Sequence, residues 1–336
     1  DENIKNKMWR EIDNISMWHE NEDCENVAEI IFYIDNEGNR CKRQWFSEMM
    51  PMKFENMEIM VPKDYDKILH TYSVLEGDSN LEGILVDTYY AKEKYLEVLH
   101  KICKTIYIDD IFALNKYPID FLINYNIYGL DLDYKSKCLT ETKLLLGPQY
   151  VPLRAQFKNI TPKFRDDVKN IFISTGGTDN FNIAGLLLDR LMERLSLESF
   201  SVLKKINYHV ISGVMNRNLP HLLEIEKAYS NVFIHQNVLN MAEIMTMCDI
   251  AVSACGSTMY ELCACGLPII TYSVADNQLQ GVKKFEESGI AVNCGNFRNN
   301  IDEVILKIIM EIWRFIQCNN LREKYSKKAY NLVMHM

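Results

Sequence analysis

The chain has 336 residues, enough for two domains of ordinary size, and its 48% hydrophobic content can fill two cores. Its formal net charge of −9 argues against a nucleic-acid partner, because a phosphate backbone needs clustered Lys and Arg. No apolar run approaches the length of a membrane span, and the ten cysteines show no metal-ligand spacing. Irregular cysteine gaps and the lack of a secretory signal predict reduced thiols in a cytoplasmic protein without metal or cofactor.

Strand and helix patterns alternate through the first half of the chain. Apolar, β-branched runs at residues 29–34, 83–87, 105–110 and 121–124 predict the strands of a parallel sheet. Asp87 ends one of these strands, and Asp109 and Asp110 end another. Ligands gather at the carboxyl ends of strands in such sheets, so these side chains either face a ligand or cap the following helices.

The pattern breaks near residues 144–154, where two prolines and a glycine fall in a short run, and a polar stretch follows at residues 158–170. We interpret this stretch as an interdomain crossing and predict domains at residues 1–157 and 158–336. Further strands are predicted at residues 170–174, 208–212, 232–234, 249–253 and 268–272. A helix is predicted at residues 182–195, and the region from residue 301 onward has an amphipathic helical pattern.

The most informative stretch is residues 253–262, where a small-residue turn follows a strand and opens a helix that carries Glu261. Gly256 allows the backbone to approach a ligand, and the N–H groups of the first helical turn point at phosphate oxygens. Glu261, one turn into the helix, can accept hydrogen bonds from ribose hydroxyls. The alternative for Glu261 is a solvated carboxylate favoured by the helix dipole. The pattern therefore predicts the nucleotide half of a nucleotide-sugar site.

A second glycine turn, Gly176-Gly177, follows the predicted strand at residues 170–174. It is either a phosphate contact or a plain strand-to-helix turn, since many α/β turns carry glycine. Arg154 similarly either binds an anion or pairs with an interdomain carboxylate.

Five segments in order resemble a known enzyme family. They are residues 84–89 (ILVDTY), 107–110 (YIDD), 147–157 (GPQYVPLRAQF), 174–179 (STGGTD) and 253–278. Together they resemble the UDP-2,4-diacetamido-2,4,6-trideoxy-β-L-altropyranose hydrolases of pseudaminic acid biosynthesis. The last segment more distantly resembles the UDP-N-acetylglucosamine transferase of peptidoglycan assembly. The resemblance implies an α/β fold of the GT-B type, with two Rossmann-like domains facing a cleft.

The resemblance also implies an activity, which is hydrolysis of a UDP-linked deoxy sugar with release of UDP. Glu261 would bind the ribose, and Arg154, Asp109 and Asp110 would lie in the sugar cleft. The remaining UDP-binding positions implied are Gly176, Gly177, Thr178, Gly256, Ser257, Thr258, Asn277 and Gln278.

The chain departs from the family at its first motif, a G-x-G-H-x-x-R loop whose histidine is thought to act on the attacking water. The best local match places Lys7 at the histidine and Arg10 at the arginine. A lysine is a poor base near neutrality, because its ordinary pKa is about 10.4. Either residues precede Asp1, or the chain is a divergent homologue with changed or lost catalysis. Lys7, Asp87 and Tyr89 are the catalytic candidates.

Two alternatives to the hydrolase stay open at this point. One is a GT-B glycosyltransferase that passes the sugar to an acceptor. The other is a catalytically silent UDP-sugar binder, favoured if Lys7 occupies the histidine position.

Overall fold

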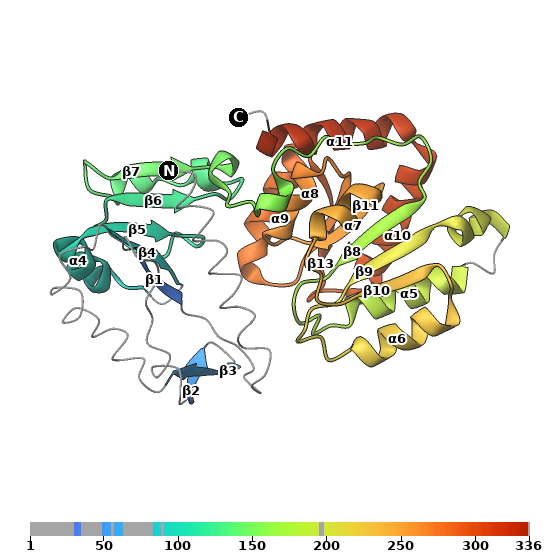
Figure 1. Ribbon diagram of the computed structural model, residues 1–336, viewed down its shortest axis with the longest axis horizontal. Helices are drawn as coiled ribbons and strands as arrows, with labels where there is room; N and C mark the ends of the chain where they lie inside the picture. Colours follow the sequence, from blue (N-terminus) through green and yellow to red (C-terminus); the bar gives the residue numbers. More distant parts are fainter. Residues whose placement is uncertain are drawn as a thin grey trace. The chain divides into compact units, whose positions relative to one another are not determined.

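The computed structural model describes residues 30–34, 49–54, 57–62, 83–88, 91–194 and 198–334. The chain divides into two compact units, Asp1–Tyr150 and Val151–Met336. Each unit is built around a β-sheet of its own (Figure 1). The division falls a few residues before the boundary expected at residue 157.

The first unit contains a sheet in the order β1-β4-β5-β6-β7. Its strands are β1 (Ile30–Ile34), β4 (Gly83–Asp87), β5 (Lys104–Ile108), β6 (Phe121–Asn124) and β7 (Lys143–Leu146). Strands β4 to β7 are parallel, as predicted for β4, β5 and β6, whereas β7 lies where the strand pattern was expected to break. The parallel orientation predicted for the first strand is wrong, because β1 pairs antiparallel with β4. An antiparallel pair needs no crossover helix, and the described chain between β1 and β4 forms a hairpin of β2 (Met49–Phe54) and β3 (Met57–Pro62).

The core of the first unit lies between this sheet and helix α4 (Glu93–Ile102). The connections that follow β5 and β6 contain short turns and 3₁₀ segments, and these place two large aromatic residues, Tyr117 and Tyr134, in the core with no exposed surface. The other core residues include Ile84, Val86, Leu96, Leu99, Tyr107, Ile119 and Leu122. Buried phenol groups need hydrogen-bond partners, which shapes the site described below.

The second unit contains a six-stranded sheet in the order β10-β9-β8-β11-β12-β13, in which all neighbouring strands are parallel. Its strands are β8 (Asn170–Ser174), β9 (Asn207–Ile211), β10 (Val232–His235), β11 (Ile250–Ala254), β12 (Ile269–Ser273) and β13 (Ala291–Asn296). The five strands predicted for this half are confirmed to within a residue or two. β13 is a sixth strand that the sequence did not reveal.

The described α-helices of this unit are α5 (Ile183–Arg194), α6 (Leu219–Ala228), α7 (Met241–Met247), α8 (Thr258–Ala264), α9 (Leu279–Glu287), α10 (Ile301–Gln317) and α11 (Asn319–Met334). Helices α5 to α9 lie between successive strands, and α10 and α11 follow the last strand. The helix predicted at residues 182–195 and the helical C-terminal region are confirmed. No helix in the described ranges combines the length and apolar character that crossing a bilayer requires.

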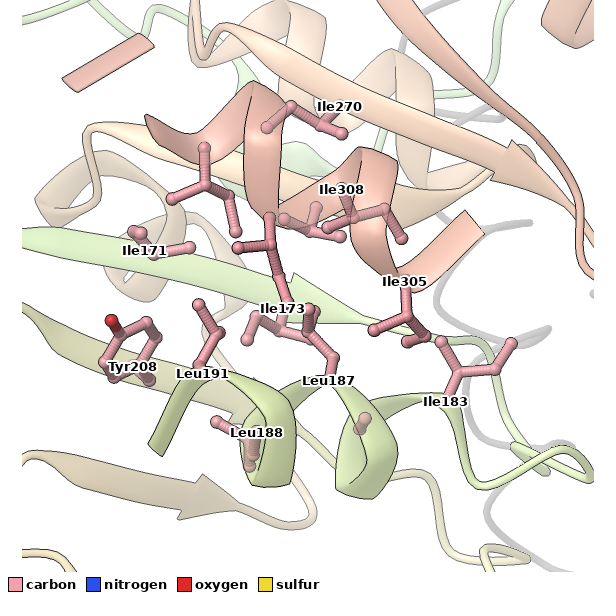
Figure 2. Close-up of a cluster of buried hydrophobic side chains, with 14 of the residues drawn as sticks. Ile171, Ile173, Ile183, Leu187, Leu188, Leu191, Tyr208, Ile270, Ile305 and Ile308 are labelled. Carbon is pink, nitrogen blue, oxygen red and sulfur yellow. The ribbon is translucent and has the colours of Figure 1, made fainter. Parts of the chain in front are cut away.

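The main core of the second unit lies on the face of the sheet covered by α5 and α10. Figure 2 shows this cluster, in which alternate residues of β8, Ile171 and Ile173, meet apolar side chains of both helices. The helical members labelled there are Ile183, Leu187, Leu188, Leu191, Ile305 and Ile308. Phe172, between the two isoleucines, is fully buried but belongs to the opposite face, as the two-residue period of a strand requires.

Arg322 is a buried cation that fixes α11 to the start of the second unit. Only 1% of the residue is exposed. Its guanidinium donates to the carbonyl of Phe315 at 2.8 Å and to those of Arg165 and Asp166 at 2.6 Å each. It also lies over the ring of Phe164, 5.1 Å from the centroid. Burial lowers the pKa of Arg322, and these acceptors offset the cost of holding the charged group away from water.

We expect Arg322→Met to lower the unfolding free energy of the protein by about 3 kcal/mol, because several buried carbonyls lose their donor. Urea denaturation followed by circular dichroism measures the change. The control is Arg190→Met, which removes an exposed arginine of α5 and should cost less than about 1 kcal/mol. Equal effects of the two substitutions would contradict the role given to Arg322.

Candidate functional site

The strand order of the second unit brings two predicted loops together. β8 pairs with both β9 and β11, so the chain builds outward through β9 and β10 and then returns to the other side of β8. Ligands of such sheets bind at this reversal, outside the carboxyl ends of the strands. Ser174 of β8 pairs with Ser253 of β11, so the loops that begin at residues 175 and 255 leave neighbouring positions at one edge.

Three glycines of these loops have open space above their backbone. A Cβ atom added at Gly176, Gly177 or Gly256 would meet no other atom within 4 Å. Gly176 has a φ of 90°, which by itself favours glycine. Packing within the unit does not explain glycine at the other two positions, and the close approach of a ligand to their backbone stays a prediction.

Gly213, which follows β9, supports the first glycine loop from behind. A Cβ atom at this position would overlap the backbone of Gly177. This contact was not predicted. Its only signal in the sequence is that a glycine, Gly213, follows closely after the end of a strand. Gly213 therefore fixes how far the Gly176-Gly177 turn can retract from the edge of the sheet.

The N-terminus of α5 is already occupied by a carboxylate of the protein itself. Asp179 is 3% exposed and accepts hydrogen bonds from the backbone N–H groups of Ile183 at 2.7 Å and Ala184 at 3.1 Å. Burial raises the pKa of Asp179, and the two backbone donors oppose that rise. Asn218 donates to the carbonyl of Asp179 at 2.7 Å and holds the turn. The first turn of α5 therefore binds Asp179, and an anion at this loop would meet the amides of the glycine turn.

The second loop presents amide donors at the start of α8. Met259 and Tyr260 donate their N–H groups back to the carbonyls of Gly256 and Ser257. Within the described part of the chain, the N–H groups of Ser257 and Thr258 donate to no acceptor. Ser257 is exposed and Thr258 is partly exposed, so both amides are placed to meet a ligand.

Glu261, also on α8, is paired with Arg154. Nε of Arg154 lies 2.7 Å from Oε1 of Glu261, and Nη2 lies 2.9 Å from Oε2. Such two-pronged pairs combine charge with fixed geometry. The structure pairs Arg154 with a carboxylate, but one of the same unit rather than the interdomain carboxylate expected. The ribose contact implied for Glu261 stays a prediction.

Asn277 and Gln278 follow β12, the neighbour of β11, so they lie at the same edge of the sheet. Oε1 of Gln278 accepts a hydrogen bond from the N–H of Val274 at 2.8 Å. The side-chain carbonyl of Gln278 therefore holds the turn that follows β12. Asn277 is exposed. Their contacts with a diphosphate or sugar stay predictions.

In the first unit, Asp109 lies at the centre of a buried hydrogen-bond network. It is 2% exposed, and its Oδ2 accepts from the hydroxyls of Tyr117 at 2.6 Å and Tyr134 at 2.8 Å. Burial and the Asp109 carboxylate raise the pKa of both phenols, which keeps them protonated as donors. Asn124 donates to the hydroxyl of Tyr134 at 2.9 Å. The network gives Asp109 a structural role, and its assignment to the sugar cleft stays a prediction.

Asp87 and Asp110 lie at the carboxyl ends of neighbouring strands. Asp87 pairs in register with Ile108, two residues before Asp110. Partial burial, and then the charge of Asp110, raise the pKa of Asp87 to about 6, although its side chain keeps exposed surface. Asp110 accepts from the side-chain amide of Asn126 at 3.0 Å. The other two catalytic candidates, Lys7 and Tyr89, lie outside the described residues.

The described cysteines are all free thiols. Burial raises the pKa values of the most enclosed of them, which makes these thiols unreactive near neutral pH. Within the described ranges, no three His, Cys, Asp or Glu residues are placed to hold a metal ion.

Sequence comparison finds relatives in bacteria and archaea, although no protein-family profile matches the chain. An uncharacterised protein of Methanocaldococcus jannaschii is 26% identical over 267 residues, which cover 76% of this chain and 50% of that protein. The Helicobacter pylori protein named pseudaminic acid cytidylyltransferase and UDP-2,4-diacetamido-2,4,6-trideoxy-β-L-altropyranose hydrolase is 25% identical over 225 residues, 64% of this chain and 38% of that protein. The UDP-2,4-diacetamido-2,4,6-trideoxy-β-L-altropyranose hydrolase of Campylobacter jejuni is 23% identical over 187 residues, 55% of this chain and 63% of that protein. The resemblance to this hydrolase family is thus confirmed, and each match spans less than two thirds of the relative's own length.

Solved structures establish the fold. Arabidopsis thaliana UGT89C1 complexed with UDP aligns with a TM-score of 0.53 and 11% identity, covering 80% of this chain and 72% of that chain. An E. coli structure described as trehalose-6-phosphate bound with UDP-2-fluoro glucose aligns with a TM-score of 0.52 and 10% identity, covering 86% of each chain. At such low identity these likenesses show the fold alone. The expected fold class, α/β with two Rossmann-like domains of the GT-B type, is confirmed.

We expect Gly213→Ala to lower the unfolding free energy by about 1–3 kcal/mol, because the new methyl group forces apart the two loops that support the site. Gly256→Ala is the matched control, since its methyl group would enter open space and should change stability by less than about 0.5 kcal/mol. Urea denaturation of the two variants provides the comparison. If both variants are as stable as the parent protein, the packing of Gly213 does not hold the loop.

Proposed function

We propose that this chain binds a UDP-linked diacetamido-trideoxy sugar and hydrolyses it to UDP and the free sugar. The observation that carries the proposal is the pairing of β8 with β11, which gathers the open glycine turns and the Ser257 and Thr258 amides at one edge of the sheet. Glu261 lies one helical turn from those amides.

The chemistry of this edge suits a nucleoside diphosphate. Backbone amides are neutral donors, and they bind phosphate oxygens without the clustered basic side chains that nucleic-acid binding needs. A carboxylate is an acceptor that suits the two hydroxyls of a ribose. Amides fixed before the reaction also stabilise the negative charge that develops on a departing diphosphate.

Hydrolysis requires a water molecule and a base. The water oxygen forms a bond to the anomeric carbon, the bond between that carbon and the diphosphate oxygen breaks, and UDP leaves with the bonding electron pair. The water proton passes to the base. This reaction is supported by the hydrolase names of the relatives in Helicobacter pylori and Campylobacter jejuni.

A glycosyltransferase is the second candidate, and the observation that favours it is the fold shared with UGT89C1. Because a fold hosts many activities, this likeness carries less weight than the names of the sequence relatives. A silent UDP-sugar binder is the third. A hydrolase releases UDP from the nucleotide sugar without an acceptor, and a glycosyltransferase releases it only when an acceptor is present. A silent binder releases no UDP.

We expect phosphorus NMR of the protein mixed with the UDP-linked diacetamido sugar to show free UDP accumulating without any added acceptor. Release only after an acceptor is supplied would favour the glycosyltransferase. Shifted or broadened diphosphate signals without release would favour the silent binder. Unchanged signals would contradict nucleotide binding itself.

We further propose Asp87 as the base, because it ends strand β4 with an exposed side chain and partial burial raises its pKa to about 6, which suits a base near neutral pH. A base acts only when deprotonated, so the rate of hydrolysis should rise as the pH is raised through about 6 and level off above it. In Asp87→Asn, the rate of hydrolysis should no longer rise with pH through about 6, and it should be at least about 100-fold lower than in the parent protein. Glu97→Gln, at an exposed carboxylate of α4 in the same unit, is the control. An Asp87→Asn variant with the parent's rate and pH profile would exclude Asp87.

A further inference from the structure

The Arg154–Glu261 pair joins two segments that lie far apart in the sequence. The residues are 107 positions apart, and both guanidinium–carboxylate hydrogen bonds are short. The side chain of Glu261 is 15% exposed and that of Arg154 is 30% exposed. A carboxylate so far removed from water is costly without a cation, and Arg154 supplies one.

Arg154 is itself held in place, so it fixes Glu261 more firmly than a mobile surface arginine would. Its guanidinium lies 5.4 Å from the centroid of the Phe157 ring, and Phe157 is fully buried. Between them, the side chain of Gln156 accepts a hydrogen bond from the N–H of Ala242 at 2.9 Å, which ties this segment to the first turn of α7. These two contacts restrict where the guanidinium can point.

A planar guanidinium bound through two nitrogens also fixes the plane of the carboxylate it binds. Glu261 would otherwise have several rotatable bonds to order when a ligand binds, at a cost in conformational entropy. A carboxylate offers about four acceptor positions, and the two bonds from Arg154 by themselves use only two of them. The pairing is therefore compatible with acceptance of further hydrogen bonds from hydroxyl groups.

We propose that Arg154 is a positioning residue for nucleotide selection, which orients the Glu261 carboxylate so that it recognises the ribose hydroxyls of the bound nucleotide. The inference rests on the proposed function, since it concerns the same UDP site. It adds a specificity: the site takes ribonucleotides in preference to 2′-deoxyribonucleotides, and this preference depends on an arginine that need not touch the ligand.

The test is isothermal titration calorimetry of the full chain with UDP and with 2′-deoxy-UDP. The measured quantity is the ratio of the two dissociation constants, because a general loss of stability or charge would affect both ligands alike. A hydrogen bond to a charged acceptor contributes enough to give the parent protein a preference of about 10-fold or more for UDP.

In Arg154→Met, which keeps an apolar stem against Phe157, we expect the preference to fall to less than about 3-fold. Arg154→Lys should restore it only in part, because an ammonium cannot bind both carboxylate oxygens in a fixed plane. Glu261→Gln should also lose the preference, and Arg154→Met added to Glu261→Gln should change the ratio no further. Arg190→Met, at the exposed arginine of α5, is the control and should keep the parent's ratio.

Four outcomes would overturn the proposal, and they separate its failure from that of the proposed function. A parent protein that binds no UDP overturns both. A parent that binds both nucleotides equally overturns the ribose contact but leaves UDP binding intact. An Arg154→Met variant that keeps the parent's ratio while binding both ligands more weakly would show that Arg154 contacts the diphosphate directly. Tighter binding of both ligands by that variant would show that Arg154 blocks the site.

Discussion

The pairing of Ser174 with Ser253 is the register on which the geometry of the second unit depends. Parallel strands need crossover connections, and right-handed crossovers place the helices on both faces of the sheet. Once β8 has β9 on one side and β11 on the other, the loops that follow β8 and β11 must leave the same edge side by side. Two segments about 80 residues apart in the chain, each unremarkable as a turn, thereby form one surface of backbone amides.

Buried ionisable side chains hold nearby segments of each unit in place. Asp179 binds the first turn of α5, Arg322 binds carbonyls from α10 and from the start of the unit, and Asp109 binds two phenols in the first unit. Each makes several hydrogen bonds, as a charge removed from water must. None of the three needs a ligand to be satisfied. Their hydrogen bonds lie within their own unit, whereas the amides of Ser257 and Thr258 donate to no acceptor in the described part of the chain.

The sequence predicted five of the strands of the second unit, helices α5 and α8 and the helical C-terminal region, because apolar periodicity and flanking turns are local signals. It also located both glycine turns. It did not predict the orientation of β1 or the contact between Gly213 and Gly177, because strand pairing and close backbone approach depend on residues distant in the chain. For the same reason the partner of Arg154 stayed open until the structure placed Glu261 beside it. The buried role of Asp109 was equally hidden, since an aspartate at a strand end looks the same whether it faces a ligand or two tyrosines.

The anchoring of α11 has a consequence for how the second unit is assembled. Tyr330 donates to the carbonyl of Ile160, 170 positions earlier, and Arg322 reaches back to Arg165 and Asp166. During synthesis, the segment that opens this unit emerges from the ribosome long before the helix that covers it. Contacts of such large sequence separation form late, because the chain entropy of closing the loop must be overcome before they contribute. The central strands can therefore pair while translation continues, but the opening segment gains its last partners only when the unit has been synthesised almost in full.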